Sequence, residues 1–293
     1  MTLFTNQARS ATGPAVERDP AGPAGQVQPR GGGTADDGTA SPEPPPFTLV
    51  VSTTLVTRAL VAVIAVLTAA GFAVNYAAYV MDSTTVSEDG RLKRLLDLDA
   101  EVNLPTWYQA VMLAVCAIVL LLIGWNQGPR QRRSAARSWM LLSLAFFYLS
   151  LDELVSLHEL TIVPLRSALD ITGGLLYFAW VILAAAVLLL LGIALVPFLA
   201  SIDPATRRRF VVAGALFVGG AFGLELVGGA LLSARNEQHD FTVKAVATVE
   251  EFLEMLAIVL FFRGLLLHIA AGGGTIVVAR AGQVSNAQSP ARP

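Results

Sequence analysis

Carboxylates inside apolar segments are the residues of this chain that could carry chemistry. They occur with one histidine in three groups: Asp152, Glu153, His158 and Glu159; Glu225; and Glu250, Glu251 and Glu254. An ionisable side chain at the centre of a bilayer costs about 2.5–3.5 kcal/mol or more, and it usually faces a protein interior or a wet cavity. A group of carboxylates with few cations nearby either holds protons or binds a cation.

Six apolar segments must position these groups. They lie near 55–80, 105–125, 138–159, 174–199, 210–233 and 244–269. Each is long enough to cross a hydrocarbon core of about 30 Å as a helix, and helix is the form in which a single segment pairs its own backbone groups in lipid. Only 14% of the residues are charged, against roughly 25% in soluble domains. The sequence therefore predicts an all-α integral membrane bundle of about six transmembrane helices.

The two ends of the chain differ in composition from the apolar part. Residues 1–47 and 271–293 are rich in Pro, Gly, Ala and polar residues, and such segments bury too little apolar surface to fold. We expect two disordered tails around one membrane domain at 48–270. The single cysteine, Cys116, lies within an apolar run, which excludes a disulfide framework and a thiolate metal site.

Arginine distribution predicts the orientation. The loops 126–137 and 200–209 are rich in arginine, so the positive-inside rule places both in the cytoplasm, together with both termini. The predicted location is the cell membrane. The outer loop 82–104 runs against the rule, because it carries Arg91, Lys93 and Arg94. Its segment 91–99 fits either an amphipathic helix on the outer surface or a solvated loop.

This topology places the three acidic groups at similar depth in the outer half of the membrane. If the third helix continues to Glu159, then Asp152, Ser156 and Glu159 share one helical face. Glu250 and Glu254 are one turn apart. We therefore expect one outward-facing cavity with His158 at its rim. The predicted metal ligands are Asp152, His158, Glu159, Glu225, Glu250 and Glu254, whereas Glu153 and Glu251 are weaker candidates.

Three functions are compatible with such a cavity. Carboxylates with one imidazole suit Mn, Fe or Zn, and a bound divalent metal would support hydrolysis of a lipid-like or small-molecule substrate. Alternatively, the carboxylates form a relay in a proton- or cation-coupled transporter or channel, or they join helices in a membrane scaffold or sensor. The sequence does not decide between enzyme and non-enzyme, and it fixes neither the catalytic residues nor the oligomeric state. The lipid bilayer is the expected partner; a net charge of −2 without a basic stripe excludes nucleic acid.

Three strings of the sequence resemble those of an uncharacterised family of bacterial multi-pass membrane proteins. They are Glu101-x-Asn103-x-Pro105-Thr106-Trp107, Leu151-Asp152-Glu153-x-x-x-x-His158-Glu159, and Glu250-Glu251-x-Leu253-Glu254-Met255. The resemblance covers about 95–262 and implies a membrane domain without an assigned activity. The chain departs from intramembrane proteases of the CAAX type, since Met255 stands where their Glu-Glu-x-x-x-Arg motif needs arginine.

Overall fold

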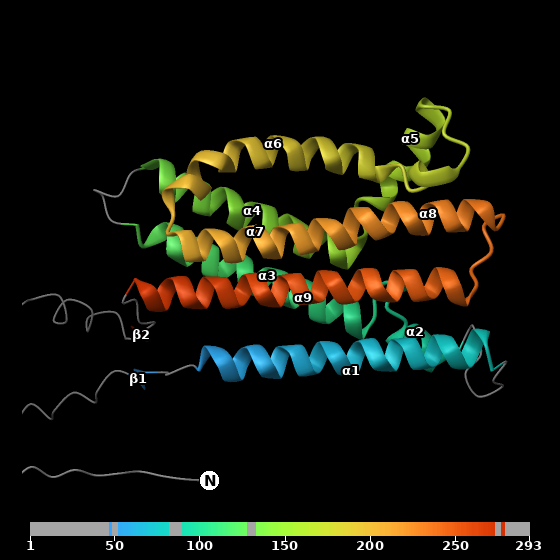
Figure 1. Ribbon diagram of the computed structural model, residues 1–293, viewed down its shortest axis with the longest axis horizontal. Helices are drawn as coiled ribbons and strands as arrows, with labels where there is room; N and C mark the ends of the chain where they lie inside the picture. The colour runs from blue at the N-terminus through green and yellow to red at the C-terminus, as the bar shows by residue number, and fades with distance from the viewer. Residues whose placement is uncertain (1–46, 49–51, 82–89, 128–132, 273–276, 279–293) are drawn as a thin grey trace, which may run out of the picture. The chain divides into compact units, whose positions relative to one another are not determined.

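Six long helices form the membrane part of the computed structural model, which describes residues 47–48, 52–81, 90–127, 133–272 and 277–278. The spans are α1 (Thr53–Tyr79), α3 (Leu104–Trp125), α4 (Arg133–Val155), α6 (Trp180–Ser201), the segment Pro204–Ala234 and α9 (Phe241–Ala271). Their length and hydropathy confirm the predicted all-α, multi-pass membrane fold (Figure 1).

The fifth span consists of three consecutive helical pieces. These are α7 (Pro204–Val218), the π-helical turn η3 (Gly219–Leu224) and α8 (Glu225–Ala234). A π-helical turn inside an α-helix is rare and is often found at functional sites. Here it comes directly before Glu225, one of the predicted site residues.

Short elements gather at one end of the helices, which we call the His158 end. They are α2 (Arg91–Leu96), η1 (Glu159–Thr161), α5 (Ile162–Ala168) and η2 (Gly174–Leu176). The end of α3, the start of α4 and the link at 202–203 lie at the opposite end, which we call the Arg207 end (Figure 1). Two two-residue strands, β1 (Phe47–Thr48) and β2 (Val277–Val278), pair antiparallel. The predicted disordered tails fall almost entirely outside the described residues.

Helix α9 lies against α1, α3, α7, η3 and α8, and α3 packs along α4 (Figure 1). Between them lies an apolar core that includes Leu113, Leu120, Met255, Val259 and Leu265. Close to the Arg207 end, this core consists of aromatic rings. The ring centroids of Trp139 and Phe198 are 4.8 Å apart. The polar groups at the His158 end therefore rest on a dry, packed layer.

The third span ends earlier than the sequence predicts. Helix α4 stops at Val155, because Ser156 takes a left-handed backbone conformation with φ of 52°. The Asp152 side chain stabilises this reversal, since its Oδ1 accepts a hydrogen bond of 2.9 Å from the backbone N–H of His158. The prediction of one helical face shared by Asp152, Ser156 and Glu159 was therefore wrong. The fourth span likewise begins at Trp180 instead of 174.

Within the segment 91–99, helix α2 has one exposed face, which includes Leu92 and Leu95, and one packed face. Lys93, Asp97 and Leu98 are all buried. A Cβ atom added at Gly71 of α1 would lie 2.0 Å from Cδ1 of Leu98 and 2.6 Å from the carbonyl oxygen of Leu96. The absence of a side chain at Gly71 is thus what lets this loop lie against α1.

Candidate metal centre

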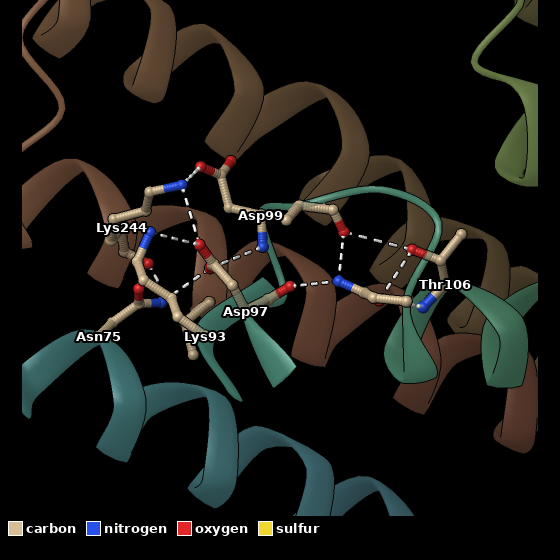
Figure 2. A network of polar contacts seen from close by, with 9 residues as sticks. Asn75, Lys93, Asp97, Asp99, Thr106 and Lys244 are labelled. Carbon is tan, nitrogen blue, oxygen red and sulfur yellow. Dashed lines mark hydrogen bonds and ion pairs between the residues drawn. The ribbon is translucent and has the colours of Figure 1, made fainter. Parts of the chain in front are cut away.

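A buried ion-pair network fixes the loop that follows α2 (Figure 2). The Nζ atoms of Lys93 and Lys244 each lie 3.2 Å from Oδ2 of Asp97, and Lys244 also pairs with Asp99. Asn75 of α1 donates a hydrogen bond of 2.8 Å to Oδ1 of Asp97. Burial alone would raise the pKa of Asp97, but the Asn75 hydrogen bond and the two lysine charges outweigh it and lower that pKa. The Asp97 carboxylate therefore joins α1, α2 and α9.

Asn103 connects the same loop to α3. Its Nδ2 donates to the carbonyl oxygens of Asp97 and Ala100, at 2.7 and 2.6 Å, while its Oδ1 caps the helix by accepting from Thr106 N (Figure 2). Between these anchors, Val102 has φ of 56°. A left-handed conformation is unusual for a β-branched residue and persists only where the surroundings enforce it. Together these contacts hold Glu101 at the start of α3.

Glu101 lies beside the turn that follows α4. One ligand atom each of Glu101, His158 and Glu159 lies within 4.8 Å of the other two. Both glutamates are exposed and His158 is half-buried. Ligands of a zinc ion lie about 2.0–2.2 Å from it, so small side-chain movements would bring the three atoms onto one ion. Among the described residues, this is the group of acidic and histidine side chains that meets this spacing.

Asp152 orients the histidine from behind. Its Oδ2 lies 2.9 Å from Nδ1 of His158, so Nε2 is the ring nitrogen that could ligate an ion. A carboxylate behind a metal-binding histidine fixes its tautomer and makes it a better ligand. Burial would lower the pKa of His158, but the Asp152 hydrogen bond and the charges of Asp152, Glu159 and Glu225 raise it. Burial and the Glu101 charge raise the pKa of Glu159. The site thus has an excess of negative charge that a cation would neutralise.

Trp180 connects this group to the carboxylates of the fifth and sixth spans. Its ring centroid lies 4.8 Å from that of His158, and its Nε1 donates a hydrogen bond of 2.7 Å to Oε1 of Glu225. The carboxylate of Glu225 in turn lies close to that of Glu250. Glu225 and Glu250 therefore form a second layer behind the imidazole.

Gln109 of α3 joins two further carboxylates. Its Nε2 lies 3.0 Å from Oε2 of Glu254 and 3.3 Å from Oε2 of Glu153. Gln109 is only 1% exposed, and its Oε1 has no hydrogen-bond partner within the part of the chain that the structure describes. Gly220 of η3 makes room for this layer, because a Cβ there would lie 3.3 Å from the carbonyl oxygen of Glu250 and 3.4 Å from Cγ of Glu254.

The predicted site residues thus fall into two layers. His158 and Glu159 lie in the three-residue group, Asp152 supports it, and Glu225, Glu250 and Glu254 continue the polar contacts along the spans. Sequence reasoning missed Glu101 and Gln109. The available signal was weak: Glu101 begins one of the resembling strings, and Gln109 is a polar residue inside an apolar span.

Comparison with known protein families identifies the family of the chain. The family model described as "Domain of unknown function (DUF8692)" matches residues 59–269. The chain belongs to this family. The match includes the first span, which the three resembling strings did not cover. No curated protein and no solved structure matches the chain. Since the family description assigns no activity, the function has to be argued from the site.

Proposed function

We propose that this multi-pass membrane protein binds a divalent metal ion through Glu101, His158 and Glu159. The observation that carries the proposal is the convergence of the three ligand atoms, with Oδ2 of Asp152 at 2.9 Å from Nδ1 of His158. Two carboxylates and one imidazole suit Mn, Fe or Zn.

The donor set has the composition of a reactive metal site. Structural zinc sites are usually closed by four protein ligands, whereas catalytic sites keep three and leave a position open. A metal bound in this way activates a water molecule or polarises a carbonyl or phosphoryl oxygen. The proposed activity is therefore that of a membrane metallo-hydrolase. Glu225, held by Trp180, is a carboxylate of the transmembrane layer connected to the imidazole through that ring, and it would accept or return a proton there.

The site faces outward if the arginine-rich loops are cytoplasmic, as the positive-inside rule predicts. Both termini are then cytoplasmic and the membrane is the cell membrane. The His158 end would accordingly meet substrates from the outer leaflet or from outside the cell.

Proton or cation transport is the second candidate function, and the inner carboxylates favour it. Gln109 joins Glu153 to Glu254, and Glu225 lies close to Glu250, so polar groups follow one another for some distance along the spans. Beyond them, however, the buried residues Leu113, Met255 and Ile258 begin an apolar layer. A transport path would need this layer to open, whereas a metal site at the His158 end needs no such change.

A binding titration tests the proposal. Mn²⁺ binding to the purified full chain would be followed by electron paramagnetic resonance in wild type, Glu101→Gln and His158→Gln. We expect one ion per chain, with affinity at least tenfold lower in each variant. Asp170→Asn is the matched control, because Asp170 is an exposed acid in another loop at the same end. Equal affinity in all four proteins would contradict the site. A loss confined to Glu250→Gln and Glu254→Gln would move the ion to the inner layer and favour the transport function.

A further inference from the structure

An apolar groove runs along α6 on the face toward η3. It has a volume of about 510 Å³, and its walls come from α6 between Ala185 and Val196 and from Phe222. The wall residues are all apolar or glycine. Eleven helical steps of 1.5 Å give the groove a length of about 16 Å, close to half of a hydrocarbon core of about 30 Å. The groove lies around the middle of α6 (Trp180–Ser201), and its length is close to that of one acyl chain entering from the His158 end.

The groove opens toward the lipid. Helix α6 has a mean hydropathy of 2.9, the highest of the six spans. Leu189, Ile193 and Val196 are 62–65% exposed. Gly192 widens the groove, since a Cβ atom added there would meet nothing within 4 Å. In a bilayer these surfaces are covered by hydrocarbon, because no polar group is present to hold water.

Two aromatic rings connect the groove to the candidate metal centre. Phe222 forms part of the wall, and its ring centroid lies 5.8 Å from that of Trp180. Trp180 in turn contacts the His158 ring, at 4.8 Å between centroids, and donates its indole N–H to Glu225. Trp180 is the first residue of α6 and precedes Ala185 by about 8 Å along the axis. A chain in the groove would therefore reach the imidazole at its polar end.

We propose that the groove binds one acyl chain of a phospholipid whose ester and phosphate groups lie at Glu101, His158 and Glu159. The apolar walls recognise the chain, and the metal centre takes the anionic phosphate, which the acidic side chains alone would repel. The headgroup half of this inference rests on the proposed function; the acyl-chain half rests on the groove alone. The substrate class of the proposed hydrolase is then an ester-linked membrane phospholipid, drawn from the leaflet at the His158 end.

Photolabelling of the full chain in nanodiscs tests the inference. The probe is phosphatidylglycerol with a diazirine at the middle of one acyl chain, and labelled residues are mapped by mass spectrometry. We expect labelling of 185–196 to exceed severalfold that of the exposed α1 side chains Val61, Val63 and Val66. Gly192→Phe fills the groove and should reduce labelling of 185–196 at least fivefold. Gly214→Phe is the matched control, because a Cβ at Gly214 also meets nothing within 4 Å, and it should label like wild type.

The outcomes separate this inference from the proposed function. Equal labelling of α6 and α1, or labelling unchanged in Gly192→Phe, overturns the lipid site even where Mn²⁺ binding is intact. Labelling that Gly192→Phe removes supports the lipid site, including in a protein that binds no Mn²⁺. The headgroup half is tested by adding Mn²⁺, which should increase groove labelling in wild type severalfold. An increase of the same size in His158→Gln, or none in wild type, overturns that half.

Discussion

At the scale of single residues, Asp152 has two roles that depend on each other. One oxygen accepts the backbone N–H of His158 and the other approaches its ring, so the same carboxylate ends helix α4 and orients the imidazole. If the helix continued, a histidine one turn after Asp152 could not contact that carboxylate with both its backbone N–H and its ring. The chain reversal at Ser156 thus brings His158 back to Asp152, so that this carboxylate can orient the imidazole.

We expect Asp152→Asn to weaken metal binding by about 10–100-fold, the usual effect of losing the partner behind a metal-bound histidine. The asparagine NH₂ group would donate to Nδ1 and thereby favour the tautomer whose Nε2 carries the proton. Zinc affinity measured by isothermal titration calorimetry checks this. Asp170→Asn serves again as control, and a Kd for Asp152→Asn within a factor of two of wild type would contradict the assigned role.

Asp97 predicts a pH dependence of stability. Its pKa is lower in the folded chain than in the unfolded chain, where aspartate titrates at about 3.9. The ionised form therefore stabilises the fold above about pH 4, and this contribution is lost as the pH falls through the folded pKa. Thermal unfolding in detergent between pH 2 and 7 measures it. The slope of Tm against pH in the acid range should be smaller in Asp97→Asn; parallel curves would contradict the prediction.

Lys244 lies at the centre of the same network and is 8% exposed. Lys244→Met leaves Asp97 with only Lys93 as a buried cation, so we expect the free energy of unfolding to fall by about 3–5 kcal/mol, as when one partner of a buried pair is removed. Denaturant unfolding in mixed micelles measures the loss. In a double-mutant cycle, Asp97→Asn combined with Lys244→Met should recover part of it. Full additivity of the two changes would show that the pair does not interact.

At the scale of elements, the sequence predicts the spans well and their ends less well. Hydropathy and length identify the six helices, and the caps at Asn103 and Asp203 lie where a capping residue precedes proline. The early end of α4 was not predictable, because it depends on a side-chain bond from Asp152 to a backbone that has already turned. The burial of Lys93 and Asp97 was not predictable either, since Asp97 also pairs with Asn75 of α1 and Lys244 of α9.

Gly71 tests how α2 positions the metal centre. A methyl group at this position would meet the Leu98 side chain and the Leu96 carbonyl oxygen, so Gly71→Ala should displace the loop that carries Glu101. We expect a lower Tm together with weaker metal binding. Gly214→Ala, in open space within α7, should leave binding unchanged and stabilise its helix by up to about 1 kcal/mol. Wild-type Tm and affinity in Gly71→Ala would contradict the coupling.

At the scale of the whole molecule, polar and apolar layers divide the described spans. Carboxylates, Gln109 and the lysine network lie toward the His158 end, and packed aliphatic and aromatic side chains lie toward the Arg207 end. The sequence indicated that the acidic groups share a depth. It could not indicate that Glu101 joins His158, or that Gln109 joins Glu153 to Glu254, because those contacts depend on which helices are neighbours.

The central claim is a metal centre with one imidazole and two carboxylates, and X-ray absorption spectroscopy of the zinc-loaded full chain tests it most directly. We predict a first shell of nitrogen and oxygen at about 2.0–2.2 Å, with the outer-shell scattering of a single imidazole that disappears in His158→Gln. A first shell of oxygen alone in the wild type, or an imidazole signal that persists in His158→Gln, would contradict the account.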